Sequence, residues 1–247
     1  MKRMFGAVAV AILAVTLTAC LPATTTTTGT QSNTPGAIAP VGSLAAASVQ
    51  AGASSGSLSV DPQNVGDLML FGIEDSNTTL PTVSSVSGGG VSSWTLLASD
   101  LDAAYTQDGD EIWEGVVTTP GPSTVTMTLN GYSDGDDLLA QEFTAGSPVT
   151  WSLDKSGTVT GTDAQSFNYP SLTPARSSEL YFGIGNAINN TQLVGEGTPG
   201  VTYVSTGLEC VSLVVYDTNT SSALAPAVAN SGGGGNGETA LAVLVQS

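Results

Sequence analysis

From Ser54 onward, polar and apolar residues alternate or form short apolar runs, and Gly, Pro, Asn and Asp separate these segments. The clearest alternation is Thr124–Leu129, where Val125, Met127 and Leu129 fall on one face of a strand. No window has the period of an amphipathic helix. The predicted strands are residues 65–73, 94–98, 112–118, 124–129, 138–143, 149–153, 180–184, 201–204, 208–216 and 241–245. Many short strands separated by turns are typical of an antiparallel β-sandwich or barrel.

The start of the chain has a different pattern. Lys2 and Arg3 precede an apolar run from Met4 to Leu17, and small residues follow. This arrangement is typical of a secretory signal, and the run is shorter than the roughly 20 apolar residues that span a membrane. We therefore expect residues 1–19 to be a signal peptide and the protein to be extracellular or displayed at the cell surface.

Leu17-Thr18-Ala19-Cys20 resembles the lipobox of bacterial lipoproteins. The resemblance implies cleavage before Cys20, a lipid on its thiol and attachment to a membrane. Two alternatives remain open: an ordinary secretion signal that ends at Ala19, and a pilin-like leader cut after Gly6. A disulfide between Cys20 and Cys210 would exclude lipidation, although burial of Cys210 in a strand is the simpler expectation.

Residues 20–53 are dominated by Ala, Thr, Ser, Gly and Pro and contain no charged residue. Such a composition buries too little apolar surface to offset the entropy of ordering the chain. We expect a linker over residues 20–53, followed by a single β-sandwich domain over residues 54–247.

Charge and composition exclude several functions. The chain has 4 basic and 21 acidic residues and no histidine, and its net charge is −17. Lys155 and Arg176 are the only basic residues beyond the predicted signal. This balance argues against nucleic acid as a partner and against charge-driven adhesion to anionic lipid. The lack of histidine excludes Ser-His-Asp and Cys-His catalysis and histidine metal sites.

Acidic residues gather in two segments, which are candidates for binding Ca²⁺ because that ion takes six to eight oxygen ligands. Their spacing does not match an EF-hand, and solvated turns rich in Asp and Gly are the alternative. The candidate calcium ligands are Asp100, Asp102, Asp108, Asp110, Asp134, Asp136 and Asp137.

Glu111-Ile112-Trp113-Glu114 raises the possibility of glycan cleavage, because glycosidases commonly use two carboxylates. On a strand, however, Glu111 and Glu114 point to opposite faces and do not form an acid–base pair. We therefore do not expect an enzyme, and we name no catalytic residue.

The tryptophans are candidates for stacking on sugar rings. Trp151, between Thr150 and Ser152, is the one we expect to be exposed, and Trp113 is the second candidate. A core position is the alternative for both, and it is the expectation for Trp94.

Three stretches carry a resemblance to a known module: Gly66–Leu70, Trp94–Leu97 and Ile112-Trp113 before an alternating Thr/Val strand. In addition, Leu70–Ile73 resembles Tyr181–Ile184, and an apolar strand follows a Gly/Ser-rich loop at the end. This order resembles a β-sandwich module of secreted and surface proteins of bacteria and of some phage structural proteins. The resemblance implies a jelly-roll-like fold and surface display, and it supplies no catalytic residues.

These observations predict an all-β, antiparallel, jelly-roll-like β-sandwich. We expect a non-catalytic cell-surface protein that acts in adhesion or extracellular structural assembly, with self-association or surface glycans as its partners. Carbohydrate binding, with Ca²⁺ as a possible cofactor, is the alternative function. A carboxylate-based glycan-cleaving enzyme is the third.

Overall fold

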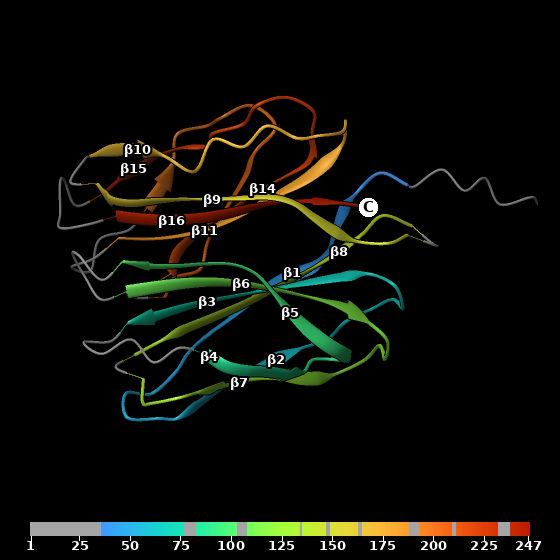
Figure 1. The fold of residues 1–247 in the computed structure, drawn as a ribbon, viewed down its shortest axis with the longest axis vertical. Helices are drawn as coiled ribbons and strands as arrows, with labels where there is room; N and C mark the ends of the chain where they lie inside the picture. Colours follow the sequence, from blue (N-terminus) through green and yellow to red (C-terminus); the bar gives the residue numbers. More distant parts are fainter. Residues whose placement is uncertain are drawn as a thin grey trace, which may run out of the picture. The chain divides into compact units, whose positions relative to one another are not determined.

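The computed structural model describes residues 36–76, 83–102, 108–133, 135–146, 149–162, 165–187, 193–208, 211–231 and 238–247. Residues 34–247 form one compact unit. The described part contains 16 strands, all in antiparallel ladders, which confirms the predicted fold class (Figure 1). A search of the same residues for a helix able to cross a membrane finds none.

The first eight strands form two sheets. Sheet A has the order β1-β8-β3-β6-β5, and sheet B has the order β2-β7-β4. The strands are β1 (Ala39–Ser48), β2 (Ser55–Val60), β3 (Leu68–Ser76), β4 (Val83–Gly88), β5 (Val91–Asp102), β6 (Asp108–Val117), β7 (Ser123–Leu129) and β8 (Asp137–Thr144).

The last eight strands form two further sheets. Sheet C has the order β9-β16-β11-β14-β13, and sheet D has the order β10-β15-β12. The strands are β9 (Ser152–Thr162), β10 (Ser166–Asn168), β11 (Glu179–Ala187), β12 (Leu193–Gly195), β13 (Thr202–Ser205), β14 (Val211–Thr220), β15 (Ala227–Asn230) and β16 (Glu238–Gln246).

The two sets of strands have the same order. Adding eight to each strand number converts sheet A into sheet C and sheet B into sheet D. Each half, β1–β8 or β9–β16, is therefore a jelly-roll-like sandwich of eight strands. We call them the first half and the second half. The sequence predicted a single sandwich, whereas the structure packs two of them sheet to sheet.

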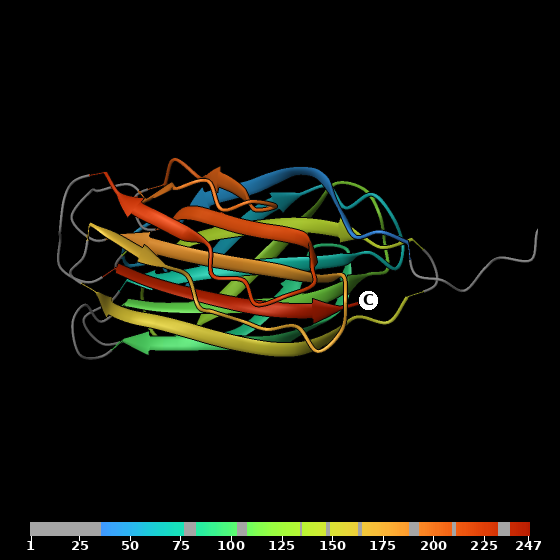
Figure 2. The ribbon, with the colours of Figure 1, turned by 90° about the horizontal axis from the view of Figure 1, so that it is seen from above.

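The sheets stack in the order B, A, C, D, with three cores between them (Figures 1 and 2). The middle core joins the two halves and contains Leu68, Leu70 and Phe143 of sheet A with Phe182 and Val243 of sheet C. The core between sheets A and B is mainly aliphatic, and the core between sheets C and D is rich in aromatic rings. Sheets A and C are covered on both faces, which explains why β8 is almost continuously buried and why β16 contains the unbroken apolar run Ala240–Val245.

The two similar sequence stretches lie on the central strands β3 and β11, but their faces differ. Phe71 points toward sheet B, whereas Phe182 points into the middle core. A shift of one residue exchanges the faces of a strand. By face, Leu70 therefore corresponds to Phe182, and Glu74 corresponds to Asn186.

The predicted linker is wrong over its second part, because Ala39–Ser48 is strand β1 and pairs with β8. Leu44 and Ala46 pack against the middle core, while Ala45 and Ala47 pack against the core of the first half. Ala and Ser have low β-propensity, so the sequence carries no strand signal here. Pairing with β8 and burial of methyl groups on both faces stabilise the strand. Residues 20–35 and the predicted signal peptide, with Cys20, lie outside the described residues.

Most predicted strands are confirmed with shifted ends, but residues 149–153 were misplaced. Val149 and Trp151 precede the strand, which begins at Ser152 and continues to Thr162. This segment is mainly Ser, Thr and Gly without an apolar period, and its pairing with β16 makes it a strand. The other strands without a strong sequence signal are β2, β4, β10, β12 and β15.

Gly72 and Gly115 lie inside two of the predicted strands and mark close approaches of neighbouring chain segments. A Cβ atom at Gly72 would lie 2.9 Å from Leu139 Cδ1, across sheet A, and 3.1 Å from Ile184 Cγ2 in sheet C. A Cβ atom at Gly115 would lie 2.3 Å from Val91 Cγ1, where β5 has a register shift. These positions let the neighbouring strands and sheets pack closely.

Candidate functional site

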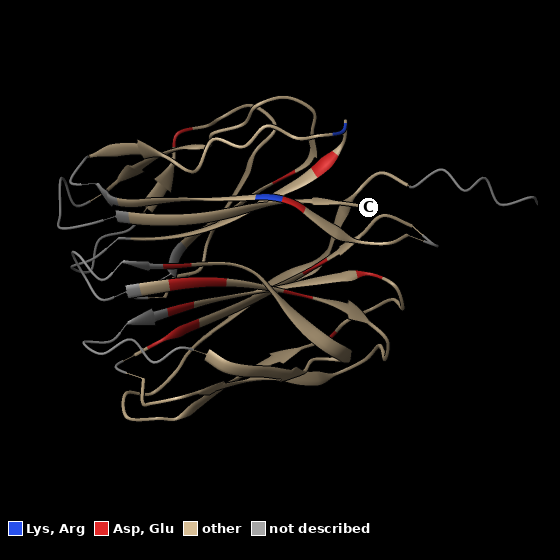
Figure 3. Cartoon of the chain, viewed as in Figure 1, with Lys and Arg blue, Asp and Glu red and all other residues tan. Residues whose placement is uncertain are grey.

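The two acidic segments of the sequence meet on sheet A. Asp100 on β5 lies opposite Asp110 on β6, which lies opposite Glu74 on β3, which lies opposite Asp137 on β8. Residues directly opposite one another in a sheet share a face. Four carboxylates therefore form a row across four strands, at the end of the sheet where the acidic segments gather (Figure 3). We call Glu74, Asp100, Asp110 and Asp137 the acidic layer.

Sheet C supplies neutral partners to the acidic layer. Asn186 Nδ2 on β11 donates to Glu74 Oε1 over 3.4 Å, and Thr239 Oγ1 on β16 lies 3.2 Å from Asp110 Oδ2. Thr239 Oγ1 also lies 2.7 Å from Asn186 Oδ1. Glu74, Asp110, Asp137, Asn186 and Thr239 are all at most 3% exposed. The two halves thus share a buried polar network at one end of the middle core.

The basic residues in the described part of the chain lie at the surface. Lys155 and Arg176 are exposed, and the ion pair in the described part of the chain joins Lys155 to Asp154 at 3.7 Å. Ionised carboxylates on neighbouring strands repel one another, and a proton or a cation between them removes the repulsion.

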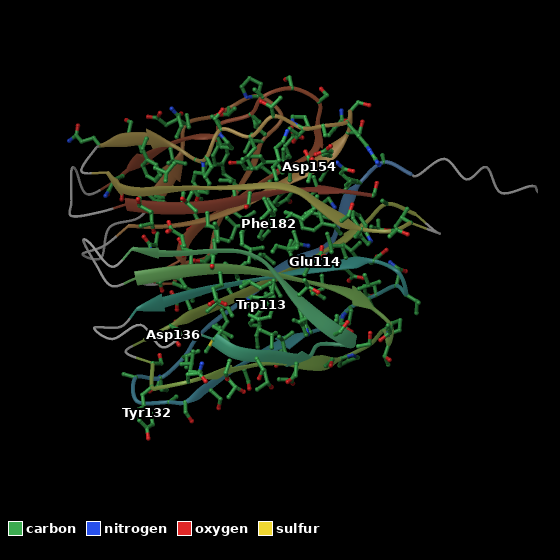
Figure 4. All side chains as sticks on the ribbon, viewed as in Figure 1. Trp113, Glu114, Tyr132, Asp136, Asp154 and Phe182 are labelled. Carbon is green, nitrogen blue, oxygen red and sulfur yellow. The ribbon has the colours of Figure 1, made fainter. Side chains whose placement is uncertain are left out.

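Calcium binding stays a prediction. Asp100, Asp110 and Asp137 come together in the acidic layer, and Asp136 is fully buried nearby in sequence (Figure 4). Within the described residues, no group of three or more acidic or cysteine side chains is arranged to hold a metal. Asp134 and the side chains of Asp102 and Asp108 lie outside the described part, as does Cys210.

Glu111 and Glu114 point to opposite faces of sheet A, as predicted. Glu111 lies opposite Ile73, on the side of sheet B, and accepts a hydrogen bond from Trp113 Nε1 at 2.7 Å. Glu114 lies opposite Leu70, on the side of the middle core. Burial raises the pKa of both carboxyl groups, because desolvation disfavours the charged form. The two do not form an acid–base pair.

A second pair of buried acids holds a loop in place. Glu142 on β8 accepts backbone N–H bonds from Gln63 at 2.9 and 3.0 Å and from Asn64 at 3.2 Å. Asn64 Nδ2 in turn donates to Asp67 Oδ2 at 2.9 Å. Burial raises the pKa of Glu142 despite the opposing effect of these N–H groups. Glu142 also borders a pocket of about 230 Å³ beside the register shift of β1.

The tryptophans chosen for sugar binding are not exposed platforms. Trp151 is only 7% exposed, packs in the middle core and donates from Nε1 to Gly66 O at 3.0 Å. The expectation that Trp151 is exposed is therefore wrong. Its polar neighbours Thr150 and Ser152 suggested a surface position, whereas tertiary packing between the halves covers the ring. Trp113 and Trp94 are partly buried against the core between sheets A and B.

The exposed aromatic that sequence reasoning missed is Tyr132, whose side chain is 68% exposed. It lies between β7 and β8 and projects from the molecule on the side of sheet B (Figure 4). Its place in Asn130-Gly131-Tyr132-Ser133, a turn rather than a strand, was the available signal.

The outer face of sheet B carries only hydroxyl side chains, and we call it the hydroxyl face. On β7 it has Thr124, Thr126 and Thr128, which alternate with the buried residues Val125, Met127 and Leu129. The neighbouring strands place serines opposite these threonines. The serines of the hydroxyl face are Ser55, Ser57 and Ser59 on β2 and Ser85 and Ser87 on β4.

Comparison of this chain with protein-family models, curated proteins and solved structures finds no match.

Proposed function

We propose that this protein is a non-catalytic cell-surface protein that acts in adhesion or extracellular structural assembly, attached to a membrane through a lipid on Cys20. The observation that supports assembly is the edge of sheet B formed by β2. An unprotected edge strand offers backbone N–H and C=O groups to a strand of another molecule.

The other edge strands that the structure describes carry protective features. Register shifts interrupt the ladders of β1, β4, β5 and β9, and such irregularities disfavour further pairing. The edges β10, β12 and β13 are only three or four residues long. In contrast, β2 has six residues, SGSLSV, in unbroken register with β7, and it contains neither proline nor charge.

The test is the oligomeric state of the purified chain as a function of concentration, measured by sedimentation velocity and electron microscopy. We expect concentration-dependent oligomers or filaments. Ser57→Lys, on β2, should suppress them because a lysine protects a strand edge. Ser85→Lys is the matched control, since Ser85 is also exposed but lies on β4 at the opposite edge of the same sheet. A chain that stays monomeric at all concentrations would count against assembly.

The exposure of Tyr132 favours a second candidate function, carbohydrate binding. An exposed ring can stack on a sugar, and hydroxyl groups of sheet B lie on the same side of the molecule (Figure 4). A glycan array probed with the chain in calcium buffer tests this function. Binding that Tyr132→Ala removes would support it, and loss of binding with a chelator would add Ca²⁺ as a cofactor.

A further inference from the structure

The loop of residues 61–67, which leads into β3, is fastened to sheet A by a carboxyl group. Glu142 on β8 accepts the backbone N–H groups of Gln63 and Asn64 at distances of 2.9, 3.0 and 3.2 Å. The side chain of Asn64 in turn donates to Asp67, at the end of the loop. A hydrogen bond also joins the carboxyl groups of Glu142 and Asp67, which are 5% and 3% exposed. Two carboxyl groups can form such a bond only when one of them carries a proton.

Loss of this proton would leave two buried negative charges side by side. Burial raises the pKa of Glu142 above the ordinary value of 4.5, and Asp67 raises it further, against the opposing effect of the loop N–H groups. Asp61 borders the same pocket as Glu142, whereas the residues of β1, β2 and β3 that border this pocket are uncharged. The charged groups around Glu142 therefore disfavour its ionised form.

The second half fastens the corresponding segment with two acids that have a cation beside them. By face, Glu179 at the start of β11 corresponds to Asp67, and it accepts the N–H of Arg176 at 2.8 Å. Burial raises the pKa of Glu179, and the charge of Asp154 adds to this effect. However, Lys155 Nζ lies 3.7 Å from Asp154 Oδ2, and a positive charge favours ionised carboxylates. The pair in the first half therefore depends more on its proton than the pair in the second half.

The loop of residues 61–67 also contacts the second half. Trp151, which packs in the middle core, donates from Nε1 to Gly66 O at 3.0 Å. The pocket of about 230 Å³ beside Glu142 is bordered by Asp61 and Gln63 of the same loop. This volume can admit water and gives the loop room to move. A movement of the loop would therefore change the surroundings of Trp151.

We propose that Glu142 and Asp67 form a pH-sensitive clasp, in which one shared proton holds the loop of residues 61–67 against sheet A and loss of this proton loosens the loop. As the pH rises, the proton passes to water and the two carboxylates repel each other. The end of the loop then moves away from β8, which weakens the contact between Gly66 and Trp151. Acidification restores the contact. This inference goes beyond the proposed function and does not depend on it.

The experiment follows Trp151 by fluorine-19 nuclear magnetic resonance of the full chain labelled with 5-fluorotryptophan. The chain contains three tryptophans, and Trp151→Phe identifies the signal of Trp151. Between about pH 4 and about pH 8, we expect this signal to shift with a midpoint above the ordinary carboxyl pKa of 4.5. The signal of Trp94 should stay constant, because its Nε1 donates to a backbone oxygen, Gly88 O.

Two substitutions should abolish the response of Trp151. Glu142→Gln should hold the signal at its low-pH position, because the amide oxygen accepts the loop N–H groups and the amide N–H donates to Asp67. Asp67→Asn removes the other charge and should have the same effect. Glu111→Gln is the matched control, since Glu111 is a buried glutamate of the same sheet that bonds Trp113. It should change the response of Trp113 and leave that of Trp151 unaltered.

Circular dichroism and the melting temperature establish which variants are folded. Three results would overturn the proposal. The first is a Trp151 signal that does not change with pH in the unmodified chain. The second is an unaltered titration of Trp151 in the folded Glu142→Gln or Asp67→Asn variant. The third is a simultaneous change in the signal of Trp94, which would indicate unfolding of the whole molecule rather than release of one loop.

Discussion

The two halves of the molecule share a strand order but fill their outer cores in different ways. In the first half, the central strand β3 contributes the large side chains of Phe71 and Ile73 to the core between sheets A and B. In the second half, the positions of β11 that correspond by face are Gly183 and Gly185, and the ring of Tyr169 occupies the space. Tyr169 Oη donates to Leu213 O at 2.9 Å, which fixes the ring. The same strand order is therefore compatible with an outer core filled by large side chains of the central strand or by a large side chain of the segment that covers the sheet.

The halves also differ in charge. Residues 39–144 contain 14 of the 21 acidic residues, whereas Lys155 and Arg176 both belong to the second half. The outer faces differ as well, because sheet B shows hydroxyl side chains, whereas sheet D shows Ala227, Ala229 and Val194 beside Ser166 and Asn168. Strand order depends mainly on the apolar pattern, which leaves outward-facing residues free to diverge.

The largest expected effect on stability comes from substituting Trp151, which packs between the two halves. Trp151→Ala removes a buried ring from the middle core and its hydrogen bond to Gly66, and should lower the free energy of unfolding by about 3–5 kcal/mol. Trp151→Phe keeps a ring and loses the bond, so we expect about 1 kcal/mol. Urea denaturation measures both. Equal midpoints for Trp151→Ala and the unmodified chain would show that this contact does not stabilise the pairing of the halves.

Alanine at two corresponding positions should destabilise the halves for opposite reasons. Ile73→Ala leaves a cavity and should cost about 2–5 kcal/mol. Gly185→Ala places a Cβ atom 2.4 Å from Tyr169 Oη and should cost about 1–3 kcal/mol through overpacking. The measurement is again urea denaturation.

Tyr169→Phe tests the second of these effects, because it removes the oxygen atom that the new Cβ would meet. The cost of Gly185→Ala should be smaller in the Tyr169→Phe background. Additive costs would contradict the close packing of this ring against β11.

An additional carboxyl group in the polar network that the two halves share should destabilise the protein. Asn186→Asp replaces the donor to Glu74 with another carboxyl group, and should cost about 1–3 kcal/mol at neutral pH. Burial beside Glu74 raises the pKa of the new group, so its protonation on acidification should restore much of the loss. Asn168→Asp, on the exposed surface of β10, is the control and should change stability by less than about 0.5 kcal/mol. A cost that does not depend on pH would argue against this explanation.

The smallest expected effect is the change in stability of the unmodified chain with pH. Burial raises the pKa of Glu111, Glu114 and Glu142 in the first half and of Glu179 in the second. The folded chain therefore holds protons that the unfolded chain releases, and stability falls as the pH rises from the ordinary carboxyl pKa of 4.5 through the raised values. The melting temperature should be higher at about pH 5 than at about pH 7.

Single substitutions locate this pH dependence. Glu114→Gln should reduce the difference in melting temperature between the two pH values, because it removes one buried titrating group. Glu196→Gln, an exposed position of the second half, should leave the difference unchanged. A melting temperature that rises between these pH values would contradict the direction given by burial.

Much of the candidate site depends on contacts that no sequence pattern reports. The sequence shows that Asp100, Asp110 and Asp137 are acidic, but their alignment depends on the registers of four strands. Glu74 belongs to the same row only because β3 pairs with β6 and β8. The polar neighbours of Trp151 predict a surface position, whereas packing between the halves buries its ring. The hydroxyl face was equally hidden, since its serines and threonines come from strands far apart in the chain.

The sequence by itself determined the all-β class, the strands with strong apolar alternation, the opposite directions of Glu111 and Glu114, and the lack of histidine chemistry. These properties follow from the residues present and from the two-residue period of a strand. Only the tertiary structure decided that Ala39–Ser48 is a strand, that the chain forms two sandwiches, and that four carboxylates share one row. The reason is physical: pairing, register and burial between distant segments are set by the free energy of the whole packed molecule, in which weak local preferences are readily overridden.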